Sequence, residues 1–151
     1  MFGRLTGVRF FALAVVVLAV TASGVAHASA DPQPTLTVRS SPYGAILFDG
    51  GGRALYAFTR DRRGGPSRCY GACARAWPVY FAGRRLVAGK GVKRSLIGTV
   101  RRRDGRRQIT YNGRPLYYYV GDRSAGQVSC QNVAEYGGTW LVVRPNGALV
   151  R

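Results

Sequence analysis

Histidine is almost absent from this sequence. One histidine, His27, and one methionine, Met1, occur in 151 residues, and both lie within the first 30. Those 30 residues have the features of a cleaved leader, so we expect the mature chain to contain no histidine. That absence excludes a Ser-His-Asp or Cys-His catalytic set from the mature chain. It also excludes histidine-ligated zinc, copper or haem.

The leader is interpreted as a secretory signal peptide spanning residues 1–30. Two arginines precede an unbroken apolar run at residues 10–20, and small residues lead up to cleavage after Ala30 or Ala28. The run is shorter than the roughly 20 residues that cross a bilayer, and no later stretch reaches that length. We therefore expect an exported, soluble product, with a retained membrane anchor as the alternative.

Acidic residues and lysine are scarce as well. The chain has six acids against 23 Lys and Arg, and Lys90 and Lys93 are its only lysines. Without the two leader arginines, 21 basic residues and a formal charge of +15 remain. Such a charge favours an anionic partner, for which we expect a cell-envelope polymer or a lipid surface. Solubility combined with an arginine-favouring genome is the alternative explanation.

The strongest candidate for anion contact is a predicted hairpin tip around Asp104-Gly105. Specific nucleic-acid binding is disfavoured, because the chain is expected to be exported and has no recognised nucleic-acid motif. No cofactor is expected. The arginines that flank the tip are Arg101, Arg102, Arg103, Arg106 and Arg107.

The mature chain retains three cysteines, Cys69, Cys73 and Cys130. In an exported protein this number suggests one disulfide and one remaining thiol. We favour a Cys69–Cys73 pair, because residues four apart can meet in a tight turn. A bridge from Cys130 to either of them is the alternative, and it would stabilise the fold more by closing a longer loop. The three sulfurs also suggest a thiol-redox or soft-metal site as a second functional hypothesis.

The sequence contains an internal duplication. Residues 55–62 (LYAFTRDR) return as residues 116–123 (LYYYVGDR). We therefore expect residues 31–151 to form a single small β-rich domain. Its two repeats would span about 43–82 and 95–150.

Turn signals and alternating patterns predict a mainly β fold of antiparallel sheets. Asp104-Gly105 and Asn112-Gly113 predict type I′ hairpins, which need a positive φ at both central residues. A helical pattern is confined to residues 70–77, and Pro78 ends it.

The duplicated segment is interpreted as an aromatic strand. Alternation places Tyr56 and Phe58 on one face, which we expect to be the buried one. In the second copy Tyr117 and Tyr119 share a face and Tyr118 lies on the other. We expect one of those two faces to be exposed and able to stack a ligand.

Asp61 and Asp122 follow the two aromatic strands. Two carboxylates can share acid–base work in a hydrolase when their surroundings separate their pKa values. The favoured interpretation is structural, in which each aspartate caps a turn and pairs with the adjacent Arg62 or Arg123.

These motifs support a resemblance to a known family. A Tyr-x-aromatic-x-x-Asp pattern occurs at residues 56–61 (YAFTRD) and 117–122 (YYYVGD), and CYGACARAWP stands between them at 69–78. Across essentially the whole mature chain, the sequence resembles the bacterial family described as a secreted repeat of unknown function, predicted lipoproteins with a Yx(FWY)xxD motif. The resemblance implies an exported, duplicated, β-rich domain and supplies no activity. Because no cysteine stands at the end of the signal peptide, we expect no lipid anchor.

From the sequence we expect a non-catalytic binding module, secreted or associated with the cell envelope, whose basic surface engages an anionic partner. An extracellular thiol-redox or soft-metal-binding protein is the second hypothesis. A carboxylate hydrolase is the third.

Overall fold

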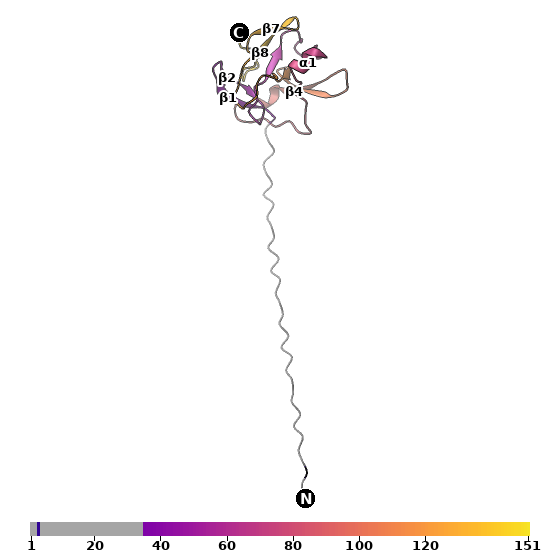
Figure 1. The fold of residues 1–151 in the computed structure, drawn as a ribbon, viewed down its shortest axis with the longest axis vertical. Coiled ribbons are helices and arrows are strands. Elements are labelled where there is room, and N and C mark those ends of the chain that lie inside the picture. Colours follow the sequence, from indigo (N-terminus) through magenta and orange to yellow (C-terminus); the bar gives the residue numbers. More distant parts are fainter. Residues whose placement is uncertain (1–2, 4–34) are drawn as a thin grey trace. The chain divides into compact units, whose positions relative to one another are not determined.

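The computed structural model describes residue 3 and residues 35–151, and the rest of the predicted signal peptide lies outside the described residues. The regular secondary structure of the described part is mainly β, with one short helix, α1 (Ala72–Ala76), and one 3-10 turn (Arg94–Leu96) (Figure 1). The predicted mainly β, antiparallel fold is confirmed. The strands are β1 (Thr37–Ser41), β2 (Gly44–Phe48), β3 (Tyr56–Phe58), β4 (Ile97–Arg101), β5 (Arg107–Tyr111), β6 (Arg114–Tyr117), β7 (Val133–Glu135) and β8 (Gly138–Val142).

The two repeats interlock in a single sheet. A six-stranded sheet has the order β4-β5-β6-β3-β8-β7, and β1 and β2 form a separate pair. Strand β3 of the first repeat lies between β6 and β8 of the second, with Tyr56 opposite Tyr117 on one side and Val142 on the other. In return, Val79 of the first repeat bridges Tyr117. Each aromatic strand therefore pairs with the segment that follows the other aromatic strand.

Both faces of β3 are buried. Tyr56 and Phe58 belong to one apolar cluster, together with the two tryptophans. Leu55 and Ala57 belong to a second cluster on the opposite face. The predicted burial of the Tyr56/Phe58 face is confirmed, and the opposite face is buried as well, because β3 occupies an interior position in a sheet that is covered on both sides.

The same arrangement corrects the prediction of an exposed aromatic face in the second copy. Tyr117 is fully buried in the first cluster, and the partly buried Tyr119 packs against that cluster. Tyr118 packs against the second cluster and is also partly buried. Tyr117 therefore offers no stacking surface, and Tyr118 and Tyr119 are each only partly exposed.

The centre of the first cluster is a stack of aromatic rings. The rings of Trp77 and Trp140 are parallel within 2°, with centroids 4.0 Å apart. Phe58 stacks on Trp140 at 4.2 Å, and Tyr56 meets Trp77 edge to face at 5.2 Å. Since the tryptophans come from different repeats, this stack joins the two halves of the domain.

Both predicted hairpins form, and one of them has the predicted type I′ turn. Asn112 and Gly113 both have positive φ, 49° and 73°, as a type I′ turn requires. At Asp104-Gly105 only the glycine has a positive φ, and Arg102 N–H donates to the Arg106 carbonyl. That turn is a three-residue loop with glycine in the left-handed region, so the type I′ prediction was wrong there.

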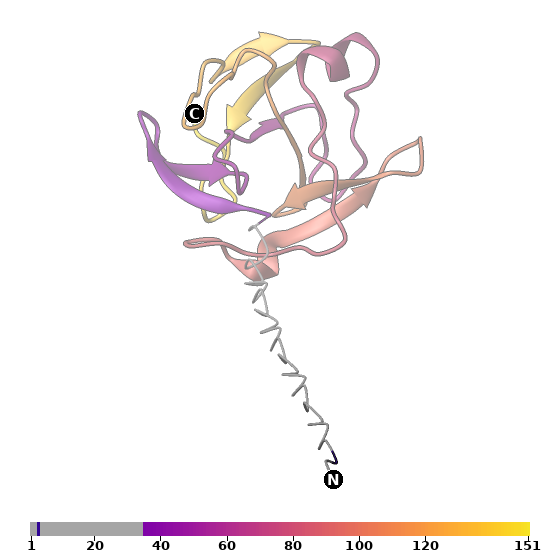
Figure 2. The same ribbon diagram turned by 60° about the horizontal axis from the view of Figure 1, so that its bottom comes forward.

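The helical turn at residues 70–77 is confirmed as α1. Strand β7 pairs with β8 at one edge of the six-stranded sheet. Figure 2 shows the β4–β5 hairpin reaching outward at the edge of the domain. Its tip is the basic segment singled out in the sequence.

Candidate functional site

The arginine hairpin, residues 101–107, places its five arginines in two different environments. Arg101, Arg103, Arg106 and Arg107 are exposed. Arg102 is only 5% exposed. Arg102 is therefore removed from the five predicted anion contacts, since its guanidinium is turned into the protein, and contact by the other four stays a prediction.

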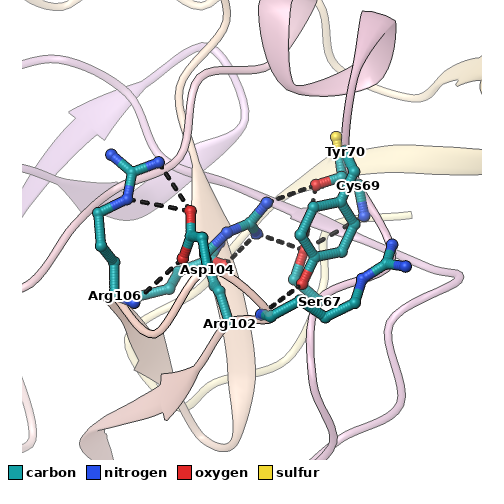
Figure 3. A network of polar contacts seen from close by, with 8 residues as sticks. Ser67, Cys69, Tyr70, Arg102, Asp104 and Arg106 are labelled. Carbon is teal, nitrogen blue, oxygen red and sulfur yellow. Dashed lines mark hydrogen bonds and ion pairs between the residues drawn. The ribbon is translucent and has the colours of Figure 1, made fainter.

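Arg102 anchors the hairpin to the loop that precedes α1 (Figure 3). Its Nη1 donates to Ser67 Oγ at 2.6 Å and to Gln108 Oε1 at 2.8 Å. Its Nη2 donates to the carbonyl oxygen of Cys69 at 2.7 Å. Three hydrogen bonds from these two nitrogens offset part of the cost of burying the charge, while the buried Nε of Arg102 has no partner among the described residues.

A chain of hydroxyl groups connects Arg102 to a buried carboxylate. Ser67 Oγ accepts from Arg102 and from the backbone N–H of Cys69, which leaves its own proton for Tyr117 Oη at 2.6 Å. Tyr117 in turn donates to Asp61 Oδ2 at 2.5 Å. The positive and negative groups are thus joined through two hydroxyls without direct contact.

Burial shifts both titrating groups of this chain. Desolvation raises the pKa of Asp61, and the hydrogen bond from Tyr117 opposes that rise. Desolvation and the neighbouring Asp61 carboxylate raise the pKa of Tyr117. The phenol of Tyr117 therefore stays protonated and remains a donor.

The two aspartates of the repeated motif have matching roles across the repeats. Asp61 accepts from Tyr117 and from the backbone N–H of Arg68 at 2.7 Å. Asp122 accepts from Tyr56 at 2.6 Å and from the backbone N–H of Ser129 at 2.8 Å. Each aspartate thus holds the loop that follows it and bonds to the tyrosine of the other repeat.

The expected pairing of these aspartates with their neighbouring arginines, Arg62 and Arg123, was wrong. Within residues 35–151, the ion pair found is between Arg106 and Asp104 at 2.8 Å. Asp61 and Asp122 are both buried, and an exposed arginine beside them in sequence cannot follow them inside. Tyrosine hydroxyls and backbone N–H groups satisfy them instead.

A surface pocket of about 360 Å³ lies where the arginine hairpin meets the loop before α1. We call it the arginine pocket. Three of its side chains are arginines and none is acidic. It is lined by Arg60, Pro66, Ser67, Arg68, Tyr70 and Arg103.

Tyr70 forms a fixed wall of the arginine pocket. The guanidinium carbon of Arg103 lies 4.0 Å from the centre of its ring, and that of Arg102 lies 4.2 Å from the same centre. The Tyr70 hydroxyl also accepts the backbone N–H of Arg103 at 3.3 Å. The hairpin and the wall are therefore held together by stacking and by hydrogen bonds.

The exposed arginines outside the pocket are partly engaged. Arg106 donates to Asp104 from Nε and Nη2, at 3.0 and 2.8 Å, and lies over the ring of Phe81. That contact lowers the pKa of Asp104. Arg107 donates to Thr99 Oγ1 from Nε at 3.0 Å.

A larger surface hollow of about 560 Å³ runs beside β4. Its one charged lining residue, Arg63, already donates to the backbone carbonyl of Asn112 at 2.9 Å. Because the guanidinium of Arg63 is already hydrogen-bonded and the other lining residues are uncharged, this hollow is a weaker candidate for binding an anion than the arginine pocket.

The cysteines have a structural arrangement. Cys69 and Cys73 form a disulfide, as their spacing predicts. Cys130 is a free thiol, 7% exposed, and burial raises its pKa. Since the disulfide uses two of the three sulfurs, no three-thiolate soft-metal site exists in this oxidised form. In the part of the chain that the structure describes, no cluster of three metal-ligating side chains occurs.

Sequence reasoning missed Arg60, Arg68 and Tyr70 as candidates. Arg68 and Tyr70 flank a disulfide cysteine, and Arg60 follows the first aromatic strand. No spacing along the chain connects them to residues 101–107. The burial of Arg102, which brings these segments together, is the feature that the sequence does not signal.

One family comparison finds a match. A sequence model of the family described as "secreted repeat of unknown function" matches residues 37–80 and 98–144. No curated protein and no solved structure matches the chain. None of the helices among residues 35–151 has the length and apolar character needed to cross a membrane.

Proposed function

This chain belongs to the family described as a secreted repeat of unknown function, and we propose that it is a non-catalytic binding module for an anionic polymer of the cell envelope. The observation that carries the proposal is the exposed cationic surface made by the arginine hairpin and the arginine pocket. Three pocket arginines meet there without an acidic lining residue. Charges arranged in this way attract polyanions over a range set by the salt concentration.

A polymer is favoured over a lipid surface by the surroundings of these arginines. Proteins that lie on membranes combine basic residues with exposed apolar ones that enter the bilayer. The exposed large apolar residues of the described chain are Tyr43, Val120 and Tyr136. None of them belongs to the arginine hairpin or lines the arginine pocket.

The non-catalytic part of the proposal is supported by the state of the reactive groups. Asp61 and Asp122, the carboxylates that a hydrolase would need, are buried and engaged with tyrosines and backbone N–H groups. The thiol hypothesis has less support, because Cys69 and Cys73 are joined and Cys130 is buried.

Retention on an anionic polysaccharide tests the proposal. The exported protein is applied to phosphocellulose and eluted with a salt gradient, beside two variants of equal charge. One variant carries R103Q, R106Q and R107Q in the arginine hairpin, and the other carries R39Q, R84Q and R85Q at exposed sites elsewhere.

We expect wild type to be retained and released by salt, because exposed charges are screened within about 10 Å at 0.1 M. The hairpin variant should elute at lower salt than the remote variant. Absent retention of wild type, or identical elution of the two variants, would contradict the proposal. Thermal unfolding of both variants serves as the folding control.

A further inference from the structure

The guanidinium groups of the arginine pocket have donors to spare. Arg60 donates to the carbonyl of Tyr136 at 3.0 Å, which fixes its position. Within residues 35–151, no acceptor is hydrogen-bonded to the guanidinium of Arg68 or of Arg103. The guanidinium groups of Arg68 and Arg103 are therefore free to donate to a ligand, while Arg60 is already held in place.

The walls of the arginine pocket are fixed before any ligand arrives. Arg102 joins the hairpin to the carbonyl of Cys69, and the disulfide holds Cys69 to α1. Tyr70 lies between the guanidinium groups of Arg102 and Arg103. A site that needs little ordering loses less free energy on binding, so a small charged group can be held there.

The chemistry of the pocket suits a phosphate group. Arginine presents a planar fork of donors that matches the oxygens of phosphate, and such charge-assisted bonds are roughly twice as strong as neutral ones. No acidic side chain lines the pocket, and Asp61, which accepts the backbone N–H of the lining residue Arg68, is buried. The volume of about 360 Å³ lies in the range of small-molecule sites and leaves room for the unit to which a phosphate is attached.

We infer that the arginine pocket is a subsite for one phosphate group carried on a sugar or polyol unit of the polymer. Arg68 and Arg103 bind its oxygens, Arg60 supplies a third charge, and the attached unit contacts the edge of the Tyr70 ring, whose faces are covered by the two guanidinium groups. This inference rests on the proposed function and assigns it a discrete site. The other exposed arginines of the hairpin contact neighbouring units of the polymer.

Matched arginine variants test the inference. Isothermal titration measures the binding of glycerol phosphate to wild type, R68Q and R103Q, and to R62Q and R101Q. Arg62 and Arg101 are exposed, lie close in sequence to Arg68 and Arg103, and do not line the pocket. All four variants lose one charge, so a difference between the pairs reports the pocket and not the net charge.

We expect R68Q and R103Q to weaken glycerol phosphate binding by about tenfold or more, and R62Q and R101Q by about twofold or less. Variants R68K and R103K, which keep the charge and lose the fork, should fall between. Equal weakening by all four glutamine variants would overturn the subsite. So would binding of inorganic phosphate as tight as glycerol phosphate, since the attached unit would then contribute nothing.

A failure of the phosphate subsite can be distinguished from a failure of the proposed polymer binding. Retention on phosphocellulose, with the comparison of the hairpin and remote variants, tests the proposed function, whatever the glycerol phosphate titrations show. Equal retention on carboxymethyl cellulose, a carboxylate polymer, would overturn the preference for phosphate while leaving polymer binding in place. Tighter binding to phosphatidylglycerol vesicles than to phosphocellulose would overturn the assignment to a polymer.

Discussion

The carbonyl oxygen of Cys69 accepts a hydrogen bond of 2.7 Å from Nη2 of Arg102. Through this bond the tip of the β4–β5 hairpin is held against the disulfide-closed segment that precedes α1. The arginine pocket lies at this junction, with Arg68 and Tyr70 on one side and Arg103 on the other. A buried arginine thus positions exposed ones.

Replacing Arg102 by methionine should destabilise the fold strongly. The substitution leaves the Cys69 carbonyl, Ser67 and Gln108 without their shared donor, and breaking a buried charge network costs about 3–5 kcal/mol. Arg101→Met, at the exposed neighbouring position, should change the free energy of unfolding by about 0.5 kcal/mol or less. Urea unfolding of both variants checks this, and similar small losses for the two would show that Arg102 is not an anchor.

The tyrosine hydroxyls that cross between the repeats should each stabilise the fold. Tyr56→Phe leaves Asp122 without its tyrosine partner, and Tyr117→Phe removes the partner of both Asp61 and Ser67. An unsatisfied buried polar group costs about 1–3 kcal/mol, so we expect losses in that range and a larger one for Tyr117.

The exposed Tyr136 provides the control for the tyrosine variants. Tyr136→Phe should shift the urea midpoint negligibly. If Tyr56→Phe and Tyr117→Phe are equally silent, the cross-repeat hydrogen bonds contribute no net stability.

The stability that Asp61 provides should fall as the pH rises. Desolvation raises its pKa in the folded protein, so the protonated form is favoured there and its contribution is complete below the pKa of the unfolded chain. That contribution is lost as the pH rises from about 4 through the folded pKa. The advantage in unfolding free energy of wild type over Asp61→Asn should therefore shrink between pH 3.5 and pH 7.

Asp104 is the control of opposite sign. Its hydrogen bonds from Arg106 lower its pKa, so its contribution is present above the unfolded pKa and lost as the pH falls. The advantage in unfolding free energy of wild type over Asp104→Asn should therefore grow as the pH rises. If the advantage of wild type over Asp61→Asn stays constant or grows as the pH rises, the pKa of Asp61 is not raised in the folded protein.

One thiol should be detected in each chain, and only after unfolding. Cys69 and Cys73 are joined, while burial both shields Cys130 and raises its pKa, which keeps the reactive thiolate scarce. Alkylation followed by intact-mass measurement, with no reductant, should add a single group in urea and almost none in buffer. Rapid modification of the folded protein would instead revive a redox role for Cys130.

The duplication made much of the fold predictable from the sequence. It defined two aromatic strands. The turn residues at 112–113 defined a hairpin between the second aromatic strand and the strand that precedes it. The helical turn before Pro78 and the Cys69–Cys73 pair were also readable from local spacing. Each of these features depends on residues close together in the chain.

The exchange of strands between repeats was not predictable in the same way. Tyr56 pairs with Tyr117 and Val142 because β3 lies in the interior of the sheet, and no local pattern encodes that position. For the same reason Arg102, one of five similar arginines in sequence, was not distinguishable as the buried one. Its partners Ser67 and Cys69 lie more than 30 residues away.

The most direct test of the account is to locate the bound polymer on the protein. Two-dimensional amide and arginine side-chain NMR spectra of the labelled exported protein would be recorded with increasing amounts of a phosphate-bearing polysaccharide. We predict salt-sensitive shifts confined to residues 60–70 and 101–107, with the side-chain signals of Arg68 and Arg103 shifting most. Shifts centred on the connector at residues 84–94, or no shifts at low salt, would contradict the claim that this surface binds an anionic partner.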